Sequence, residues 1–368
     1  MKIAFVDLKA QYESIKQEID QAVSQVINQT AFIGGPYLKQ FELEFAAFCQ
    51  SKHCIGCGNG TDAITIALKA LDIGRGDEVI TVANSFIATA EAITNAGARA
   101  VFVDINPRTF NIDVTKIEGK ITPKTKAIIP VHLYGQPADM DPIQAIAKKH
   151  NLKVIGDCAQ AHGSLYKGKP VATLADVTTY SFYPGKNLGA YGDGGAVVTD
   201  DEALSKKIRM IANHGRMEKY NHAMEGVNSR LDGLQAAILS VKLKHINKWT
   251  DARRQNASAY TRALKNSTLI LPIELPDVRA VYHLFVVRVP AEKRKGLQEH
   301  LKTNGVETGI HYPIALPYLT AYQYLGHSEK DFPEALNASQ EILSLPMFPE
   351  LTKDQIEFVA EKIREFGF

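Results

Sequence analysis

Between residues 53 and 200, short apolar runs rich in β-branched residues alternate regularly with helical patterns. This alternation constrains the fold most strongly, because it predicts an α/β domain whose mainly parallel sheet is covered by helices on both faces. The expected strands are 54–57, 78–82, 100–103, 127–131, 153–155, 177–181 and 195–199, and the expected helices are 61–71, 85–96 and 141–150. Such a sheet binds ligands beyond the carboxyl ends of its strands, so the residues that follow each strand are the first functional candidates.

The rest of the chain predicts a second, smaller unit. A long helical pattern over 231–264 leads into a strand at 282–289, a helix near 293–303 and a terminal helix at 353–368. At 368 residues the chain has the length of about two domains. We therefore expect a large domain over 1–240, whose first residues pack on the other domain, and a smaller α+β domain over 241–368.

The charge balance excludes some partners. The chain has 42 basic and 40 acidic residues, a net charge of +2, which provides no electrostatic attraction to nucleic acid or to an anionic membrane. The apolar stretch at 3–6 is too short for a secretory signal, and the weakly charged stretch at 79–90 is shorter than the roughly 20 residues of a membrane span. We expect a cytoplasmic protein.

The four cysteines include a C-x-x-C pair, Cys54 and Cys57. A zinc site would need a second ligand pair at a suitable spacing, and the nearest candidate is His53, within a predicted strand. We expect buried, reduced thiols and no metal.

A glycine-rich turn at 58–62 follows the first predicted strand and opens a helix. Its free N–H groups and the positive end of the helix dipole predict an anion site that suits a phosphate. The alternative is a structural turn in which Thr61 or Asp62 caps the helix. Ala63 stands where a dinucleotide-binding fingerprint has its third glycine, which disfavours a nicotinamide dehydrogenase.

Two charged residues follow later strands. Asp157 ends an apolar strand, where it is either a helix cap or a carboxylate able to pair with a cationic ring nitrogen. Lys186 lies in a Pro/Gly turn after another strand; it is either a solvated charge or, if removed from water, an imine-forming nucleophile. A phosphate turn, an acid and a lysine in this order supply the anchors that pyridoxal phosphate (PLP) requires.

The sequence resembles the DegT-type nucleotide-sugar aminotransferases over nearly its whole length. The resemblance is carried by residues 5–12, 58–63, 157–163, 181–189, 226–232, 311–313 and 345–347. It implies the aspartate-aminotransferase fold (fold type I), PLP with its pyridoxamine form as the cofactor, and a homodimer with shared active sites.

The resemblance also implies roles for individual residues. Lys186 would bond to the cofactor and then move a proton, and Asp157 would pair with the ring nitrogen. Phe86 would stack on the ring, unless it is a core aromatic, and Gln160 would contact the ring hydroxyl. The residues implied at the phosphate are Gly60, Thr61, Asp62, Ser181 and, from the partner subunit, Asn228.

The implied substrates are L-glutamate and a nucleotide-linked keto sugar. Tyr183, Arg230, His311 and Tyr312 would line the sugar-nucleotide cleft, although the last two also suit a structural loop. Residues 183–189 resemble those of relatives that aminate C3, so we expect a dTDP-3-keto-6-deoxyhexose, with a UDP-linked 3-keto-N-acetylhexosaminuronic acid as a close second. The product would be an amino sugar for lipopolysaccharide O-antigen or another surface glycan.

Three alternatives share the scaffold. A C4-specific aminotransferase would more often show a His-rich stretch around the lysine, and a dehydratase would have His in place of Lys186. A non-catalytic regulatory protein would be expected to lose at least one of Asp157, Ser181 and Lys186, and this sequence retains all three.

Overall fold

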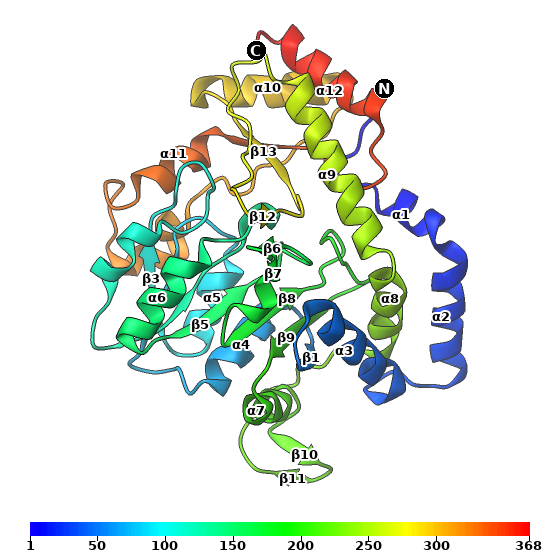
Figure 1. The fold of residues 1–368 in the computed structure, drawn as a ribbon, viewed down its shortest axis with the longest axis vertical. Helices are drawn as coiled ribbons and strands as arrows, with labels where there is room; N and C mark the ends of the chain where they lie inside the picture. Colours follow the sequence, from blue (N-terminus) through cyan, green and yellow to red (C-terminus); the bar gives the residue numbers. More distant parts are fainter.

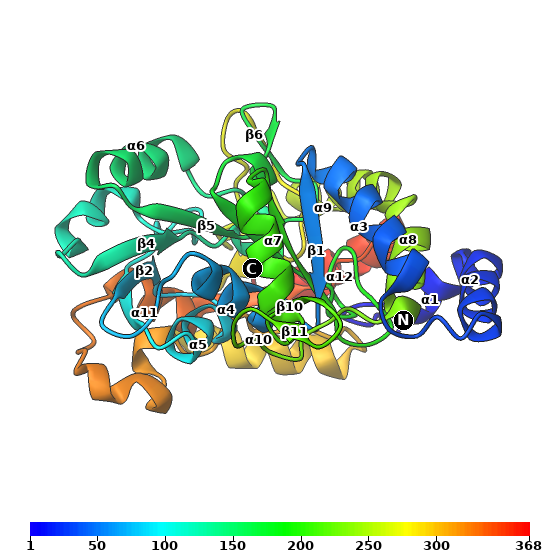
Figure 2. The ribbon, with the colours of Figure 1, turned by 90° about the horizontal axis from the view of Figure 1, so that it is seen from below.

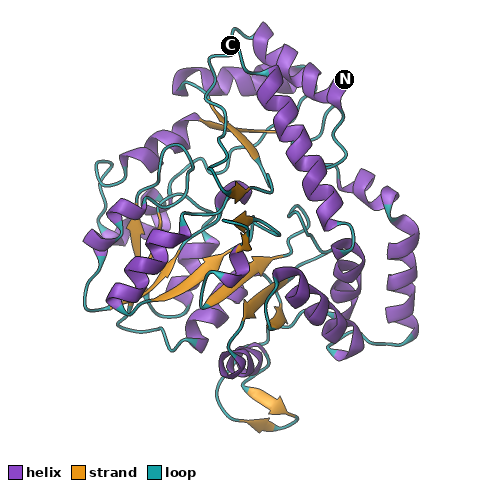
Figure 3. Ribbon diagram, in the orientation of Figure 1, coloured by secondary structure: helices purple, strands orange, loops and turns teal.

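The structure, a computed structural model, describes all 368 residues and is built around a seven-stranded sheet (Figures 1 and 3). Its strands are β1 (His53–Cys57), β2 (Glu78–Val82), β3 (Arg99–Val103), β4 (Thr125–Ile129), β5 (Lys153–Asp157), β8 (Val177–Ser181) and β9 (Gly195–Thr199), in the order β1-β9-β8-β5-β4-β2-β3. Only β9 is antiparallel to its neighbours. The predicted α/β fold with a mainly parallel sheet is confirmed.

Helices cover both faces of this sheet. They are α3 (Gly35–Cys49), α4 (Gly60–Ala70), α5 (Ala88–Asn95), α6 (Met140–His150), α7 (Glu202–Ala212) and α8 (Gly233–Leu243). Helices α4, α5 and α7 lie on one face, while α3 and α6 lie on the other (Figure 2). The apolar strands are thereby enclosed in a core of 76 buried residues.

A second core of 20 buried residues lies in the C-terminal part of the chain. It is formed around β13 (Phe285–Arg288), which pairs with β14 (Ile342–Leu345), and is covered by α9 (Ile246–Ala263), α10 (Ala291–Thr303) and α12 (Lys353–Glu365). Helix α11 (Pro333–Glu341) packs beside α10. These elements have the α+β character expected of the smaller unit.

The expected single helix over 231–264 is wrong, because the chain breaks between α8 and α9 at Lys244 and His245. Helix α8 is buried in the large core. Helix α9 begins there with Ile246 and Trp249 and ends in the small core with Tyr260. Helix α9 therefore contributes residues to both cores.

The first residues of the chain join the small core. Ile3 is 1% exposed and forms a parallel bridge with Val306, and the Phe5 N–H donates to Glu307 Oε2 at 3.2 Å. Helices α1 (Leu8–Ser14) and α2 (Lys16–Asn28) then lead to the large domain, and both termini lie near α12 (Figure 1).

Smaller elements complete the fold. β6 (Leu165–Tyr166), β7 (Lys169–Pro170) and β12 (Val278–Arg279) form a three-stranded sheet, and β10 (Arg216–Glu218) and β11 (Asn221–His222) form a hairpin that projects from the body (Figure 1). Short 3-10 helices span Val114–Lys116, Glu118–Lys120, Leu133–Gly135, Val171–Thr173, Leu316–Tyr318 and Thr320–Leu325. None of the helices has the length and apolar character needed to cross a membrane. All four cysteine thiols are buried and free.

Candidate active site

Most of the predicted site residues meet at the carboxyl edge of the large sheet. Asp157 is the last residue of β5, Ser181 is the last of β8, and Gly60 begins α4 directly after β1. Lys186 follows β8 by a short turn, and its charge interacts with that of Asp157. The edge therefore combines a helix N-terminus, a carboxylate and an amine.

Asp157 is held in a buried position at 4% exposure. Thr89 Oγ1 donates to its Oδ2 at 2.8 Å, and the Ala159 N–H donates to its Oδ1 at 3.1 Å. Ser85 Oγ lies 3.0 Å from Thr89 Oγ1 and extends this network. Burial raises the pKa of Asp157, while the two hydrogen bonds and the charge of Lys186 act in the opposite direction and favour the carboxylate.

Lys186 is half-buried in the irregular connection between β8 and β9. Its N–H donates to the Tyr183 carbonyl at 2.8 Å, and the neighbouring Ala190 N–H donates to the Phe182 carbonyl at 2.7 Å. Loss of hydration lowers the pKa of the Lys186 amine to about 8, against the opposing effect of Asp157. About a tenth of the amine is consequently uncharged at pH 7, far more than for a solvated lysine, and this fraction can act as a nucleophile or base.

The glycine-rich turn forms the N-terminus of α4. Asn59 caps the helix, since it is extended and its Oδ1 accepts from the Asp62 N–H at 2.8 Å; the alternative that Thr61 or Asp62 is the cap is wrong. The N–H groups of Gly60 and Thr61 have no intrahelical carbonyl to reach. A Cβ on Gly60 would lie 2.6 Å from Ser181 Cβ, so only glycine allows the turn to approach β8 this closely.

Ser229 braces the same turn from a distant part of the sequence. Its Oγ accepts from the Gly58 N–H at 2.9 Å and donates to Asp62 Oδ2 at 2.7 Å. The preceding Asn228 is exposed on the surface. Asp62 therefore supports the shape of the turn, and a direct contact of Asp62 with phosphate stays a prediction.

Phe86, Tyr134 and Tyr312 form an aromatic wall beside the site. Phe86 is 54% exposed, so it is not a core aromatic, and its ring centroid lies 5.7 Å from that of Tyr312. Gln160 Nε2 donates to the Tyr312 hydroxyl at 3.1 Å, and Gln160 Oε1 accepts from the Tyr134 N–H at 2.7 Å. The Tyr134 hydroxyl donates to the carbonyl of His311.

His311 is fixed between the wall and the small domain. Its Nδ1 lies 2.9 Å from Ser344 Oγ, and its ring stacks on Phe5 at 5.5 Å. Burial, together with the charge of Lys186, lowers the pKa of His311 to about 4, so the imidazole is neutral at physiological pH. Residues of the small domain thus reach the edge of the large sheet.

Two predicted substrate residues lie apart from these contacts. Tyr183 is 62% exposed on the lysine turn. Arg230 donates through Nη1 to Asn213 Oδ1 at 3.2 Å, next to the bridge between Asn213 and Asn228. Their roles at a sugar nucleotide stay predictions.

Sequence reasoning gave no role to several residues that shape the site: Thr89, Asn187, Ser229 and His283. Thr89 was detectable in principle, because it lies one helical turn after Ser85, at the carboxyl end of β2. His283 offered no such signal, since its position depends on the packing of the two domains.

Comparison with known proteins identifies the family. The DegT/DnrJ/EryC1/StrS aminotransferase family matches residues 13–364. A "pleiotropic regulatory protein" of Geobacillus stearothermophilus is 51% identical over 100% of this chain and 99% of its own length. The "dTDP-3-amino-3,4,6-trideoxy-alpha-D-glucose transaminase" of Streptomyces venezuelae is 42% identical over 100% of this chain and 96% of its own. The "UDP-2-acetamido-2-deoxy-3-oxo-D-glucuronate aminotransferase" of Pseudomonas aeruginosa is 44% identical over 97% of this chain and 98% of its own length.

Solved structures agree with this result. S. venezuelae DesV, in complex with a ketimine intermediate, matches with a TM-score of 0.97 at 41% identity and covers 99% of this chain and 98% of its own. NtdA of Bacillus subtilis, with the bound cofactor PMP, matches with a TM-score of 0.92 at 36% identity. The match covers 99% of this chain and 85% of the NtdA chain.

The residues present fit pyridoxal phosphate. The α4 N-terminus offers unpaired N–H groups to a phosphate, Asp157 offers a buried acceptor to a ring nitrogen, and Lys186 offers an amine. Asn84, fully buried at the same edge, leaves both polar atoms of its side chain without a partner. The chain belongs to the DegT/DnrJ/EryC1/StrS aminotransferase family and is a PLP-dependent aminotransferase.

Proposed function

We propose that this protein transfers an amino group from L-glutamate to C3 of a nucleotide-linked 3-keto sugar, in the biosynthesis of an amino sugar for a surface glycan. The observation that carries the proposal is the Lys186 amine, half-buried and with its pKa lowered to about 8, within the field of the buried Asp157 carboxylate. A solvated lysine would have neither feature.

When bound, pyridoxal phosphate supplies the carbonyl that exchanges the amino group and the ring that withdraws electrons. Gly60, Thr61 and Ser181 would hold the phosphate. The Asp157 carboxylate, held by Thr89 and Ala159, would pair with the ring nitrogen and keep it protonated. Phe86 would stack on the ring.

Lys186 performs the proton transfer. With its pKa near the working pH, the Lys186 amine would accept a proton from the α-carbon of the bound donor and later release it, a general acid/base task. The surrounding imidazoles of His162 and His311 have their pKa values lowered to about 3 and about 4 and so stay neutral. They therefore leave the lysine as the group that gains and loses the proton.

The two candidate sugars differ in charge. A uronate carboxylate would need a cation nearby, and of the possible partners Arg216, Lys219 and Arg230, the last already donates to Asn213. We therefore favour the dTDP-3-keto-6-deoxyhexose, whose hexose has no carboxylate, over the UDP-linked hexosaminuronic acid. The names of similar transaminases support both nucleotides.

A homodimer would complete the site. Asn228 is exposed in the single chain and lies near the projecting β10–β11 hairpin, where it could reach the phosphate of a second copy. The assembly would then carry two sites, each built from both chains.

The name of the Geobacillus relative makes a regulatory protein the second candidate. A non-catalytic protein would not need the retained set of Lys186, Asp157 and Ser181, and we propose catalysis for that reason.

The test is a spectrum followed by a substrate comparison. The purified protein with PLP should show a visible absorbance band that L-glutamate abolishes by forming the pyridoxamine cofactor. The keto sugar should restore the band, and dTDP and UDP 3-keto and 4-keto sugars compared under one condition identify the substrate. Lys186→Ala is the control and should lack the response. A wild-type protein whose band does not respond to glutamate, or that accepts only 4-keto sugars, contradicts the proposal.

A further inference from the structure

The turn that carries Lys186 is held by a residue from the other domain. The next side chain, Asn187, is 3% exposed; its Nδ2 donates to the Val281 carbonyl at 3.0 Å and its Oδ1 lies 3.2 Å from His283 Nδ1. Because a carbonyl can only accept, the amide nitrogen faces Val281 and the amide oxygen faces His283. His283 Nδ1 must therefore carry the proton in this contact.

The 281–283 segment is itself fixed. Arg253 Nη1 donates to the carbonyls of Tyr282 and His283, both at 3.3 Å, and to that of Met347 at 2.9 Å. Tyr282 has a φ of 44°, a conformation that a bulky residue adopts only when its surroundings enforce it. The segment is a rigid support rather than a free loop.

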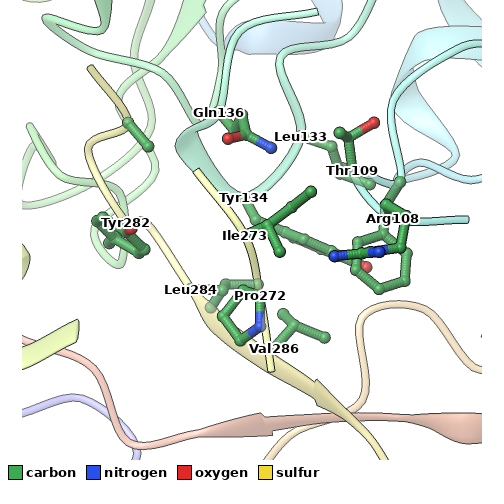
Figure 4. A pocket seen from close by; sticks show the side chains of 12 residues that line it. Arg108, Thr109, Leu133, Tyr134, Gln136, Pro272, Ile273, Tyr282, Leu284 and Val286 are labelled. Atoms are coloured by element: carbon green, nitrogen blue, oxygen red, sulfur yellow. The ribbon is translucent and has the colours of Figure 1, made fainter. Parts of the chain in front are cut away.

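The same segment contacts the aromatic wall. The Val281 N–H donates to the Gly135 carbonyl at 2.9 Å, and a Cβ on Gly135 would lie 2.9 Å from the nitrogens of Tyr282 and His283. Tyr134, Tyr282 and Leu284 also line a cavity of only about 30 Å³ (Figure 4). That volume admits no more than a few water molecules, so the junction is closely packed.

We propose that His283 is a positioning residue for Lys186: its Nδ1–H donates to Asn187 and fixes the turn that presents the lysine. The inference rests on the proposed role of Lys186 and adds a residue of the small domain to the machinery. His283 is neutral because burial, followed by the charges of Lys186 and Arg253, holds its pKa well below the ordinary value.

Two substitutions of the same residue separate the possible modes of action. In His283→Asn, the amide nitrogen can occupy the place of Nδ1 and still donate to Asn187. In His283→Gln, the amide lies at the place of Nε2, and the donor to Asn187 is lost. A role through Nδ1 therefore predicts that Asn rescues and Gln does not.

The first readout uses the apoprotein. Competitive acetylation of Lys186 over a pH series, measured by peptide mass spectrometry, gives its pKa without cofactor, donor or sugar. The titratable groups that act on this amine are Asp157, His162, His283 and His311. A loosened turn admits water, so the Lys186 pKa should rise by about 0.5 to 1 in His283→Gln, the range that one neutral hydrogen bond allows, and stay unchanged in His283→Asn.

The second readout uses the holoenzyme. In His283→Gln, kcat should fall by about two- to tenfold with KM within about twofold, because the lysine rather than the substrate is displaced. His300→Gln is the matched control on the same domain; His300 packs against Phe366, away from the site, and both parameters should be unchanged.

A double-mutant cycle tests the contact itself. Asn187→Ala should reproduce the effect of His283→Gln and abolish any further effect of that substitution. Asn187→Ala also keeps the test open if thermal unfolding shows that His283→Gln does not fold. Rescue by Gln instead of Asn, an unchanged Lys186 pKa, or additive effects in the cycle would overturn the proposal. The acetylation result stands even if the sugar substrate proves to be different.

Discussion

Replacing Thr89 by Val tests how Asp157 is kept as a carboxylate. Valine has the shape of threonine but cannot donate, so Asp157 Oδ2 loses the 2.8 Å hydrogen bond from Thr89 Oγ1 inside the protein. A hydrogen bond to a charged group contributes about 1.5–3 kcal/mol, so the apoprotein should lose about 2 kcal/mol of unfolding free energy near neutral pH. Ser85, whose Oγ lies 3.0 Å from Thr89 Oγ1, loses a partner as well.

The loss should depend on pH in a defined direction. Burial raises the pKa of Asp157 above the value of 3.8 for a free carboxyl, so the folded state binds this proton more tightly than the unfolded state does. Stability contributed by this group therefore declines as the pH rises above about 3.8. Removal of the Thr89 bond raises the folded-state pKa further, so the deficit should grow above that pH and shrink towards it, where only a neutral bond of about 1 kcal/mol is lost.

Urea unfolding of the apoprotein, from neutral pH down to the lowest pH at which it remains folded, measures the effect. Thr89→Ser keeps the hydroxyl and is the matched control, with most of the stability retained. A deficit that does not change with pH, or a serine variant as unstable as the valine variant, would refute the reasoning.

Three other substitutions probe the rest of the structure. Gly60→Ala places a methyl 2.6 Å from Ser181 Cβ, so PLP affinity measured by fluorescence titration should fall at least about tenfold; wild-type affinity would show that the turn yields. Lys242 is 1% exposed, donates to the Gly189 carbonyl, and has a pKa lowered to about 7 by burial, so the folded state releases this proton before the unfolded state does. The unfolding free energy of the wild type, relative to that of Lys242→Met, should therefore increase between about pH 7 and about pH 10.5. Urea unfolding at several pH values measures this difference, and a difference that does not change with pH would contradict the prediction. Thr352→Ala removes the capping box of α12 and should cost about 1 kcal/mol by thermal unfolding, an effect that Thr352→Ser should largely avoid.

The sheet, the lysine and the acid could be predicted because they depend on local patterns. Strand periodicity placed Asp157 at the end of β5 and Lys186 in the turn after β8, and the structure agrees. The alternative of a cap at Thr61 or Asp62 is wrong because Asn59, Thr61 and Asp62 all suit that role, and only the backbone angles select Asn59. Contacts such as Asn187 with His283 join residues 96 positions apart and follow from tertiary packing alone.

The pairing of Ile3 with Val306 has a consequence for the time course of folding during synthesis. These residues are separated by 306 − 3 = 303 positions, so residue 3 has no partner until nearly all of the protein has been made. At about 5–20 residues per second, that wait lasts roughly 15–60 s. The large sheet contains only residues up to 199 and can assemble earlier, so the small core forms last. The contact of His311 with Ser344, which brings the small core to the sheet edge, is among the final contacts to form.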